Sequence, residues 1–75
     1  EITHIGSWWD KKGENEIDII AADDMEKSVT FYEVKRQRKE LDMSALESKV
    51  QAFLKATGRY SKYRLYCKGL CMDDM

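Results

Sequence analysis

The chain has 75 residues, and its 13 lysines and arginines nearly balance its 14 aspartates and glutamates, for a net charge of -1. A domain of this size buries only about 60% of its unfolded surface, so its core is small. Because the charges balance, composition alone indicates neither nucleic acid nor membrane as a partner. The sequence has no apolar run of the ~20 residues that span a membrane and no visible signal peptide, so we expect a cytoplasmic protein without a membrane partner.

Residues 1–75 contain no repeat, no proline and no low-complexity linker, which predicts a single domain. The chain starts at Glu1 rather than at a methionine and enters strand-like sequence almost at once. We interpret it as a C-terminal piece of a longer protein. Cys67 and Cys71 lack a second cysteine pair and His4 is the only histidine, so a zinc site with about four ligands is not expected. Both cysteines are expected to be small strand residues in a reducing compartment.

Strand-like segments alternate with turn signals in the first half of the chain. A strand is expected over residues 2–9, and the loop at 10–15 supplies the glycine and polar residues of a hairpin. A second strand is expected from Glu16 to about Ala22, where the polar turn "DDMEK" begins. Residues 28–35, "SVTFYEVK", are rich in β-branched and aromatic side chains and predict a third strand.

The apolar period then becomes helical, with Leu46, Val50 and Phe53 at helical spacing and Gly58 where a helix would end. Two starts compete. Either Asp42 is the N-cap, with Leu41 and Leu46 as a hydrophobic staple, or Ser44 forms a capping box with Glu47. Both starts give a helix that ends near Thr57.

A fourth strand is expected over residues 62–70, "KYRLYCKGL". The order β-β-β-α-β makes the last pairing a crossover. We therefore expect an α/β fold, a small mixed β-sheet with a helix on one face.

The register of the second hairpin follows from its turn. If the loop is centred between Met25 and Glu26, the numbers of paired residues sum to 51. Asp18 then lies opposite Glu33, and Glu16 lies opposite Lys35, all on one face of the sheet.

The other face of this hairpin would hold Ile17 with Val34. Both faces are apolar near the turn, so the hairpin is expected to be central and covered on both sides. The adjacent Trp8 and Trp9 would point to opposite faces of the first strand, one into the core and the other outward.

Two carboxylates directly across from each other, about 5 Å apart at Cβ, destabilise a sheet unless a cation lies between them. Mg²⁺ binds one or two carboxylates together with water and substrate phosphate, which suits Asp18 and Glu33. Lys35 on the same face would steady a nucleophilic water or the charge on a phosphate under attack. The alternative is a Glu16–Lys35 salt bridge worth about 0.2–1 kcal/mol, which leaves the facing acids unexplained.

The segment Gly13–Lys35, "GENEIDIIAADDMEKSVTFYEVK", resembles the PD-(D/E)XK, or restriction-endonuclease-like, superfamily. The motif of that superfamily is an acid on one central strand and an acid-x-Lys on the next. The strings "IGSWWDKKGENEIDII" and "FYEVK" are similar, more closely, to the C-terminal domain of an archaeal-type P-loop ATPase family. In that family an AAA+-like module and a winged helix come first. The similarity covers Ile5 to about Phe53.

The resemblance implies a metal-dependent phosphodiester hydrolase fold over residues 1–75. Asp18 and Glu33 would bind Mg²⁺ or Mn²⁺, and Lys35 would be the catalytic lysine. The implied partners are DNA and the N-terminal ATPase and winged-helix parts of the parent protein. A homo-oligomer is a separate hypothesis, because the sequence does not identify the oligomeric state. ATP would bind only to the missing part of the parent chain, because no Gly-x-x-x-x-Gly-Lys motif occurs here.

The superfamily pattern is incomplete in this chain. Members usually have a helix with a further acid before the first strand, and the chain begins too late to contain it, so a restriction-endonuclease-like core lacking its first helix is expected. The Gln-x-x-x-Tyr signature of the exonuclease branch is absent, because Gln51 is followed four residues later by Lys55.

A basic run follows the acid-x-Lys directly and consists of Arg36, Gln37, Arg38 and Lys39. These residues would contact phosphates at the mouth of the site, although most such runs are solvated loops. Two hypotheses follow. One is a nuclease-like domain with Mg²⁺-dependent DNA hydrolysis or DNA binding. The other is a catalytically inactive interaction or regulatory domain of the parent ATPase, so the sequence does not decide whether the chain is an enzyme.

Overall fold

A computed structural model describes residues 1–74 and contains four strands and one long helix. The elements are β1 (His4–Trp9), β2 (Glu16–Asp23), β3 (Ser28–Lys35), α1 (Met43–Thr57) and β4 (Arg64–Cys71). Short 3-10 turns at Arg38–Glu40 and Met72–Asp74 follow β3 and β4. The predicted fold class, a small mixed α/β sheet in the order β-β-β-α-β with a helix on one face, is confirmed.

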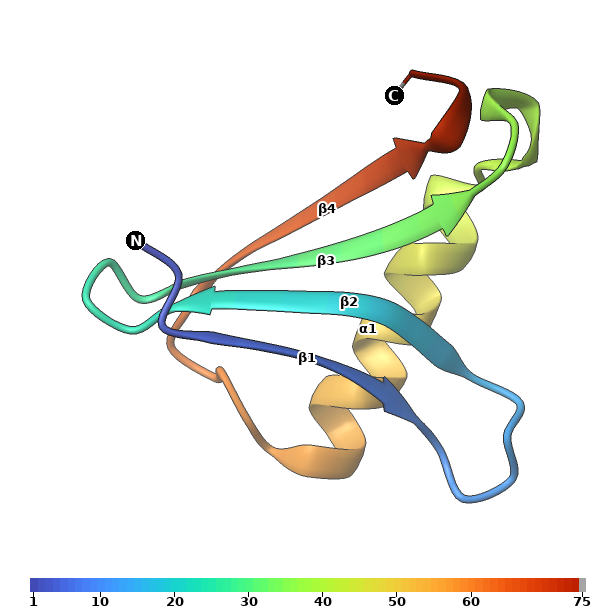
Figure 1. Ribbon diagram of the computed structural model, residues 1–75. Coiled ribbons are helices and arrows are strands. Elements are labelled where there is room, and N and C mark those ends of the chain that lie inside the picture. The colour runs from blue at the N-terminus through green and yellow to red at the C-terminus, as the bar shows by residue number, and fades with distance from the viewer. Residues whose placement is uncertain (75) are drawn as a thin grey trace.

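The sheet has the strand order β1-β2-β3-β4, so β2 and β3 are its inner strands (Figure 1). Both β1 and β3 pair antiparallel with β2. Strand β4 pairs parallel with β3 over its whole length, from Ser28↔Arg64 to Lys35↔Cys71. A parallel pair needs a crossover connection, and α1 supplies it. The predicted central position of the second hairpin is therefore confirmed.

Helix α1 begins at the first of the two predicted starts. Asp42 is the N-cap, and its side-chain Oδ1 accepts a hydrogen bond from Ala45 N at 3.0 Å. This bond satisfies one of the N–H groups that a helix start leaves unpaired. Ser44 lies inside the helix, so the alternative start is wrong. At the other end Gly58 has a φ of 67° and donates its N–H to Leu54 O at 2.9 Å, as expected for a helix stop.

The two outer strands differ slightly from their predicted bounds. Strand β1 begins at His4 rather than at residue 2. Strand β4 begins at Arg64 rather than at residue 62, because Tyr63 N donates to Tyr60 O at 3.1 Å and closes a turn before the strand.

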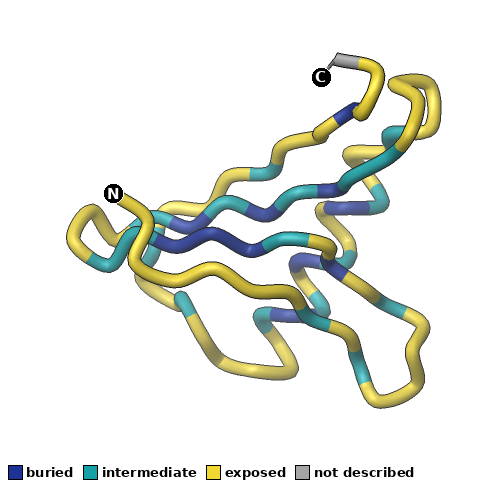
Figure 2. Tube along the Cα trace, in the orientation of Figure 1, coloured by how far each residue is buried: buried dark blue, intermediate teal, exposed yellow. Residues whose placement is uncertain are grey.

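The core lies between α1 and one face of the sheet. Figure 2 shows the buried positions gathered on β2, β3 and the side of α1 that faces them. The core side chains are Ile17, Ile20, Ala22, Val29, Phe31, Leu46, Val50 and Phe53. Phe53 is the aromatic centre, with ring centroids 5.6 Å from Phe31 and 5.4 Å from Trp8. Trp8 is half-buried and Trp9 is 67% exposed, so the predicted division of the two tryptophans is confirmed.

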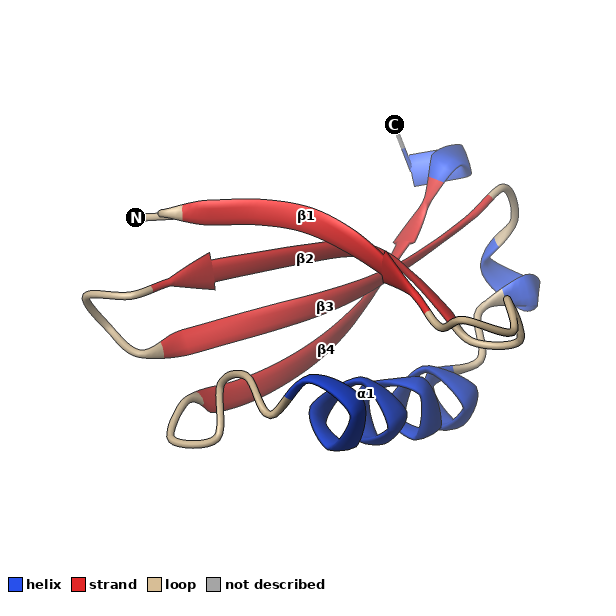
Figure 3. Cartoon of the chain, turned by 90° about the horizontal axis from the view of Figure 1, so that it is seen from below, coloured by secondary structure: helices blue, strands red, loops and turns tan. Residues whose placement is uncertain are grey.

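Within residues 1–74 the opposite face of the sheet carries no helix, as Figure 3 shows. Side-chain alternation and the strand pairing put Ile5, Trp9, Tyr66 and Leu70 on this face. Their exposed fractions are 73%, 67%, 45% and 38%, respectively. We call these four residues the open face. The expectation that the hairpin is covered on both sides is therefore not met in the described part of the chain.

A β-bulge changes the side-chain directions predicted for the start of β2. Gly6 pairs with Ile20 and Trp8 pairs with Ile17, so three steps along β2 match two steps along β1. The extra residue brings Ile17 to the same face as Ile20, and Ile17 is fully buried in the core. The prediction that placed Ile17 on the other face with Val34 is wrong, because it assumed strict alternation along the strand.

Candidate functional site

Strands β2 and β3 separate at the end where the predicted site residues lie. Their ladder joins five residue pairs, each with the predicted sum of 51, and it ends at Ile19↔Tyr32. Figures 1 and 3 both show the start of β2 and the end of β3 diverging from there. Asp18 and Glu33 are therefore not ladder partners, although the register that led to them is confirmed for these pairs. We call residues 16–18 of β2 and 33–35 of β3 the fork.

Asp18 bridges the fork with its side chain. Its Oδ2 accepts a hydrogen bond from Val34 N at 2.9 Å. The carboxylate thus satisfies a backbone donor of β3 at a point where the ladder has already ended. This bond places the exposed Asp18 carboxylate beside the peptide that joins Glu33 to Val34. The structure therefore brings the first predicted acid to the strand that carries the acid-x-Lys.

Glu33 is the buried acid of the fork, with a residue exposure of 4%. Its Oε2 accepts a hydrogen bond from Asp42 N at 3.1 Å. Its Oε1 lies 3.9 Å from Lys35 Nζ and 3.8 Å from Lys49 Nζ. A buried carboxylate is costly unless it is paired and hydrogen-bonded, and these three contacts meet that need. Two lysines and a backbone N–H of the protein therefore stabilise the Glu33 carboxyl group inside a strand.

The two lysine contacts to Glu33 are loose. Both exceed the donor–acceptor distance of about 2.7–3.2 Å for a hydrogen bond. The side chains of Lys35 and Lys49 are 40% and 28% exposed, so water screens both charges. The Oε1 atom of Glu33 thus has two positive charges nearby, at distances longer than a hydrogen bond, among the described residues.

The loop before α1 holds Asp42 N against Glu33 by packing on β4. Gly69 is the ladder partner of Glu33 in β4. A Cβ atom at position 69 would lie 2.9 Å from Leu41 Cδ1, so the missing side chain makes room for Leu41. Because Leu41 directly precedes Asp42, this contact helps to fix the N–H group that binds the buried carboxylate.

The predicted basic run follows the fork in the chain and forms a folded turn, which we call the basic corner. Its residues Arg36, Gln37, Arg38 and Lys39 are all exposed. Gln37 N donates to Glu40 Oε1 at 3.1 Å at the start of a 3-10 turn. Cys71 Sγ donates to Arg36 O at 3.5 Å, which ties the corner to the end of β4. The run is thus positioned directly after Lys35, where the sequence placed it.

The predicted alternative for Lys35 is not observed. Glu16 is exposed and pairs with Trp9 of β1. Lys35 contacts Glu33 on its own strand instead. Among the ion pairs of residues 1–74 there is no Glu16–Lys35 salt bridge.

The fork offers the donor types that a hard divalent cation prefers. Mg²⁺ in proteins is often held by one or two carboxylates and completes its shell with water and substrate phosphate. Asp18 and Glu33 provide two carboxylates, and Glu33 Oε1 has only long contacts. In the described part of the chain, no three side chains of His, Cys, Asp or Glu gather into a group that could hold a metal ion. A metal at the fork would therefore rely on water and phosphate for its remaining ligands.

Lys49 was not predicted as part of this site. It lies three residues after Leu46 and four before Phe53, so it falls on the buried stripe of α1. A lysine at an apolar position of an amphipathic helix is the one sequence signal that points to it. Its contact with Glu33 arises only because the crossover lays α1 against the end of β3.

A second polar cluster lies away from the fork, at the start of β1. Tyr63 OH donates to Asp24 Oδ1 at 2.6 Å, and His4 Nε2 lies 2.9 Å from Asp24 Oδ2. The Tyr63 hydrogen bond lowers the pKa of Asp24, and the same bond raises the pKa of Tyr63. The cluster borders a cavity of about 610 Å³ that Phe53 and Tyr60 also line. None of the predicted site residues lines this cavity.

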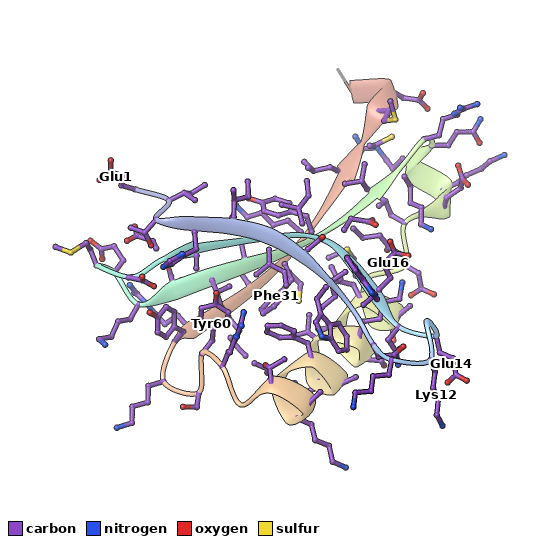
Figure 4. All side chains as sticks on the ribbon, turned by 60° about the horizontal axis from the view of Figure 1, so that its bottom comes forward. Glu1, Lys12, Glu14, Glu16, Phe31 and Tyr60 are labelled. Carbon is purple, nitrogen blue, oxygen red and sulfur yellow. The ribbon has the colours of Figure 1, made fainter. Side chains whose placement is uncertain are left out.

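The side chains in Figure 4 show how the core and the loops divide. Phe31 and Tyr60 lie between the sheet and α1, and the Phe53 and Tyr60 rings stack with centroids 6.1 Å apart. Lys12 and Glu14 extend from the outer loop between β1 and β2. Lys12 and Glu14 border a cavity that Trp8, the edge of the aromatic core, also lines.

A family model described as "Archaea bacterial proteins of unknown function" (DUF234) matches residues 1–49. The matched stretch contains Asp18, Glu33, Lys35 and Lys49, and therefore every charged side chain of the Glu33 cluster. No curated protein and no solved structure matches the chain. Residues 1–74 include no helix with the length and apolar character needed to cross a membrane.

Proposed function

The chain belongs to this family of archaeal and bacterial proteins of unknown function, and we propose that its fork is the metal site of a nuclease-like domain. The domain would hydrolyse DNA phosphodiesters, or bind DNA, as the C-terminal part of a larger ATPase. The observation that carries the proposal is the Asp18 Oδ2–Val34 N bond of 2.9 Å. It brings one carboxylate to the backbone between a second carboxylate, Glu33, and Lys35. The PD-(D/E)XK resemblance gives this juxtaposition its chemical meaning.

Each side chain of the fork has a role in such a reaction. Asp18 and Glu33 would hold a Mg²⁺ or Mn²⁺ ion, whose contribution would be Lewis-acid activation of the phosphate and of a water. The Lys35 ammonium, 3.9 Å from Glu33 Oε1, would stabilise the negative charge that builds up on the phosphate. The water oxygen forms the new bond to phosphorus, and the bond to the leaving oxygen breaks. A proton from the water ends on the leaving oxygen, which gives a phosphate monoester and an alcohol.

The basic corner supports a nucleic-acid substrate. Arg36 and Lys39 are exposed immediately beyond Lys35. Cations in such a position would contact backbone phosphates on either side of the reacting one and would add little sequence preference. Each phosphate contact would add about 0.9 to the negative slope of log affinity against log salt on duplex DNA.

Thermal unfolding of the chain tests the metal site. At a Mg²⁺ concentration ten times its Kd, binding to the folded state adds about 1.4 kcal/mol of stability. For a domain of this size that raises Tm by about 6–11 °C. Asp18→Asn should abolish the shift, whereas Glu47→Gln, an exposed acid on α1, should retain it. An unchanged Tm of the wild type with both Mg²⁺ and Mn²⁺ would exclude the site.

Cleavage assays test the hydrolase itself. Plasmid and branched DNA are incubated with Mg²⁺ and either the wild type or Lys35→Ala, which removes the ammonium but leaves both carboxylates. Cleavage by the wild type alone supports the assigned role of Lys35. Equal cleavage by both proteins would show that Lys35 is not catalytic.

The open face favours a second candidate function, an interaction domain that regulates or anchors the ATPase without cleaving DNA. Ile5 and Trp9 are 73% and 67% exposed on a sheet face that also includes Tyr66 and Leu70. Exposed apolar groups of this kind mark protein contacts. This candidate predicts that Trp9→Ser with Leu70→Ser weakens binding to the ATPase module, while Asp18→Asn does not. Binding that survives the double substitution would rule out the open face as the contact.

A further inference from the structure

Lys49 enters the fork from a different element than the acid-x-Lys. It belongs to α1, and its Nζ lies 3.8 Å from Glu33 Oε1 on β3. Lys35 Nζ lies 3.9 Å from the same oxygen. A helix and a strand thus direct one ammonium group each at one atom of a buried carboxylate.

The ion contacts of Glu33 itself are unequal in number. This one carboxylate faces two ammonium groups, although the fork as a whole also contains the carboxylates of Glu16 and Asp18. If Lys49 served only to neutralise Glu33, Lys35 would already be sufficient. The second ammonium therefore offers N–H donors to an anion at this point, rather than a net positive charge of the fork.

The ammonium of Lys49 also has hydrogen-bond donors to spare. An ammonium carries three N–H donors, and 3.8 Å is too long for a hydrogen bond to Oε1. Within residues 1–74 no other hydrogen bond or ion pair of Lys49 is found. Its side chain is 28% exposed, so these donors are accessible from solvent.

We propose that Lys49 is a phosphate-binding residue of the fork, which together with Lys35 binds oxygens of a phosphodiester in the nucleic-acid substrate. This inference rests on the proposed function, because it assigns the substrate's phosphate to the same site. It adds a residue from α1 that the acid-x-Lys pattern does not contain. Lys49 touches the substrate in this account and does not act through another side chain.

The proposal predicts opposite effects on two ligands. Replacing Lys49 by methionine removes a donor to the phosphate and should weaken nucleic-acid binding. The same change removes a positive charge 3.8 Å from a ligand oxygen of the metal, so Mn²⁺ should bind at least as tightly as before. If Lys49 only stabilised the fold, its replacement would weaken the binding of DNA and of Mn²⁺ together, because less of the protein would be folded.

Fluorescence anisotropy with a labelled duplex oligodeoxynucleotide in EDTA measures the first effect without metal. Lys49→Met should lower the affinity about tenfold, the size of one charge-assisted hydrogen bond. Lys55→Met is the matched control, because Lys55 is an exposed lysine in the last turn of the same helix. The DNA affinity of this variant should differ from that of the wild type by less than about threefold. Lys49→Arg retains the charge and should restore most of the binding. Circular dichroism verifies that all variants fold.

Calorimetric titration with MnCl₂ completes the test. Equal DNA affinities of Lys49→Met and Lys55→Met, or no DNA binding by the wild type, would overturn the role of Lys49. If Mn²⁺ still bound in that case, the metal site would stand without it. A loss of DNA binding specific to Lys49→Met, with no Mn²⁺ binding by the wild type, would support Lys49 and refute the metal site. If Lys49→Met does not fold, the DNA affinity of Lys49→Arg is compared with that of the wild type. Arginine keeps the positive charge, so a difference of more than about tenfold would contradict a charge-based contact.

Discussion

Replacing Glu33 by alanine should destabilise the chain much more than replacing it by glutamine. Alanine leaves Asp42 N without the acceptor that now lies 3.1 Å away, at the start of α1. An unsatisfied donor costs about 1–3 kcal/mol, and the lost methylene adds about 0.8 kcal/mol. The two lysines are 28–40% exposed and regain water, so their lost partner adds little. The expected total is about 2–4 kcal/mol.

Glutamine keeps the shape and one carbonyl oxygen for Asp42 N. It replaces a charge-assisted hydrogen bond with a neutral one, which costs about 1 kcal/mol. Urea denaturation monitored by circular dichroism gives both values, and Tm should fall by about 4–8 °C per kcal/mol. Glu47→Ala, at an exposed acid of α1, is the control and should stay within about 0.5 kcal/mol of the wild type. Equal losses for the two Glu33 variants would refute the role assigned to the Asp42 N–H bond.

Two further predictions concern other parts of the chain. The Tyr63–Asp24 hydrogen bond lowers the pKa of Asp24 and raises that of Tyr63, so its contribution to stability is lost as pH falls below about 4 and as pH rises above about 10. Urea denaturation at a series of pH values gives the difference in stability between the wild type and Tyr63→Phe. This difference should be constant between about pH 4 and about pH 10 and should decrease outside these limits. A difference that does not change with pH would show that the Tyr63–Asp24 hydrogen bond is not its cause. Gly69→Ala should destabilise the chain by about 1 kcal/mol or less, because the new Cβ would lie 2.9 Å from Leu41 Cδ1 and force the end of that side chain to move. A Gly69→Ala variant more stable than the wild type would show that Leu41 is free to rotate away.

The element order and the hairpin register could be predicted because each depends on local pattern. The polar turn at 23–27 sets the register of β2 and β3, and the five pairs nearest to it have the predicted sum. Asp42 and Gly58 mark the ends of α1 by capping chemistry that is visible in the sequence. These features need no knowledge of distant partners.

The arrangement of the fork could not be predicted from the same patterns. The bulge in β2 shows itself only in the pairing with β1, where Trp8 pairs with Ile17. That pairing reverses the expected direction of Ile17, and the β2–β3 ladder ends before Asp18 can face Glu33. A local hairpin model cannot contain either effect, because both depend on a third strand and on strand twist.

The contacts of Glu33 depend on tertiary structure to an even greater degree. Lys49 reaches it only through the crossover that lays α1 beside β3, and Asp42 N reaches it only through the loop that packs on Gly69. The sequence showed a charged residue in a strand and suggested a metal as its partner. The structure adds two lysines and a backbone donor as partners of Glu33, while Asp18 accepts a hydrogen bond from the backbone of β3.

An NMR titration with Mn²⁺ shows most directly whether Asp18 and Glu33 hold a divalent cation at the fork. Paramagnetic broadening falls off steeply with distance, so amide signals nearest to the ion are lost first. We predict that the amide of Val34, which donates to Asp18 Oδ2, disappears with its neighbours in β3 at the lowest Mn²⁺ concentrations, and that Asp18→Asn prevents this loss. Broadening centred on the Asp23–Asp24 turn, or no selective broadening at all, would contradict the metal site.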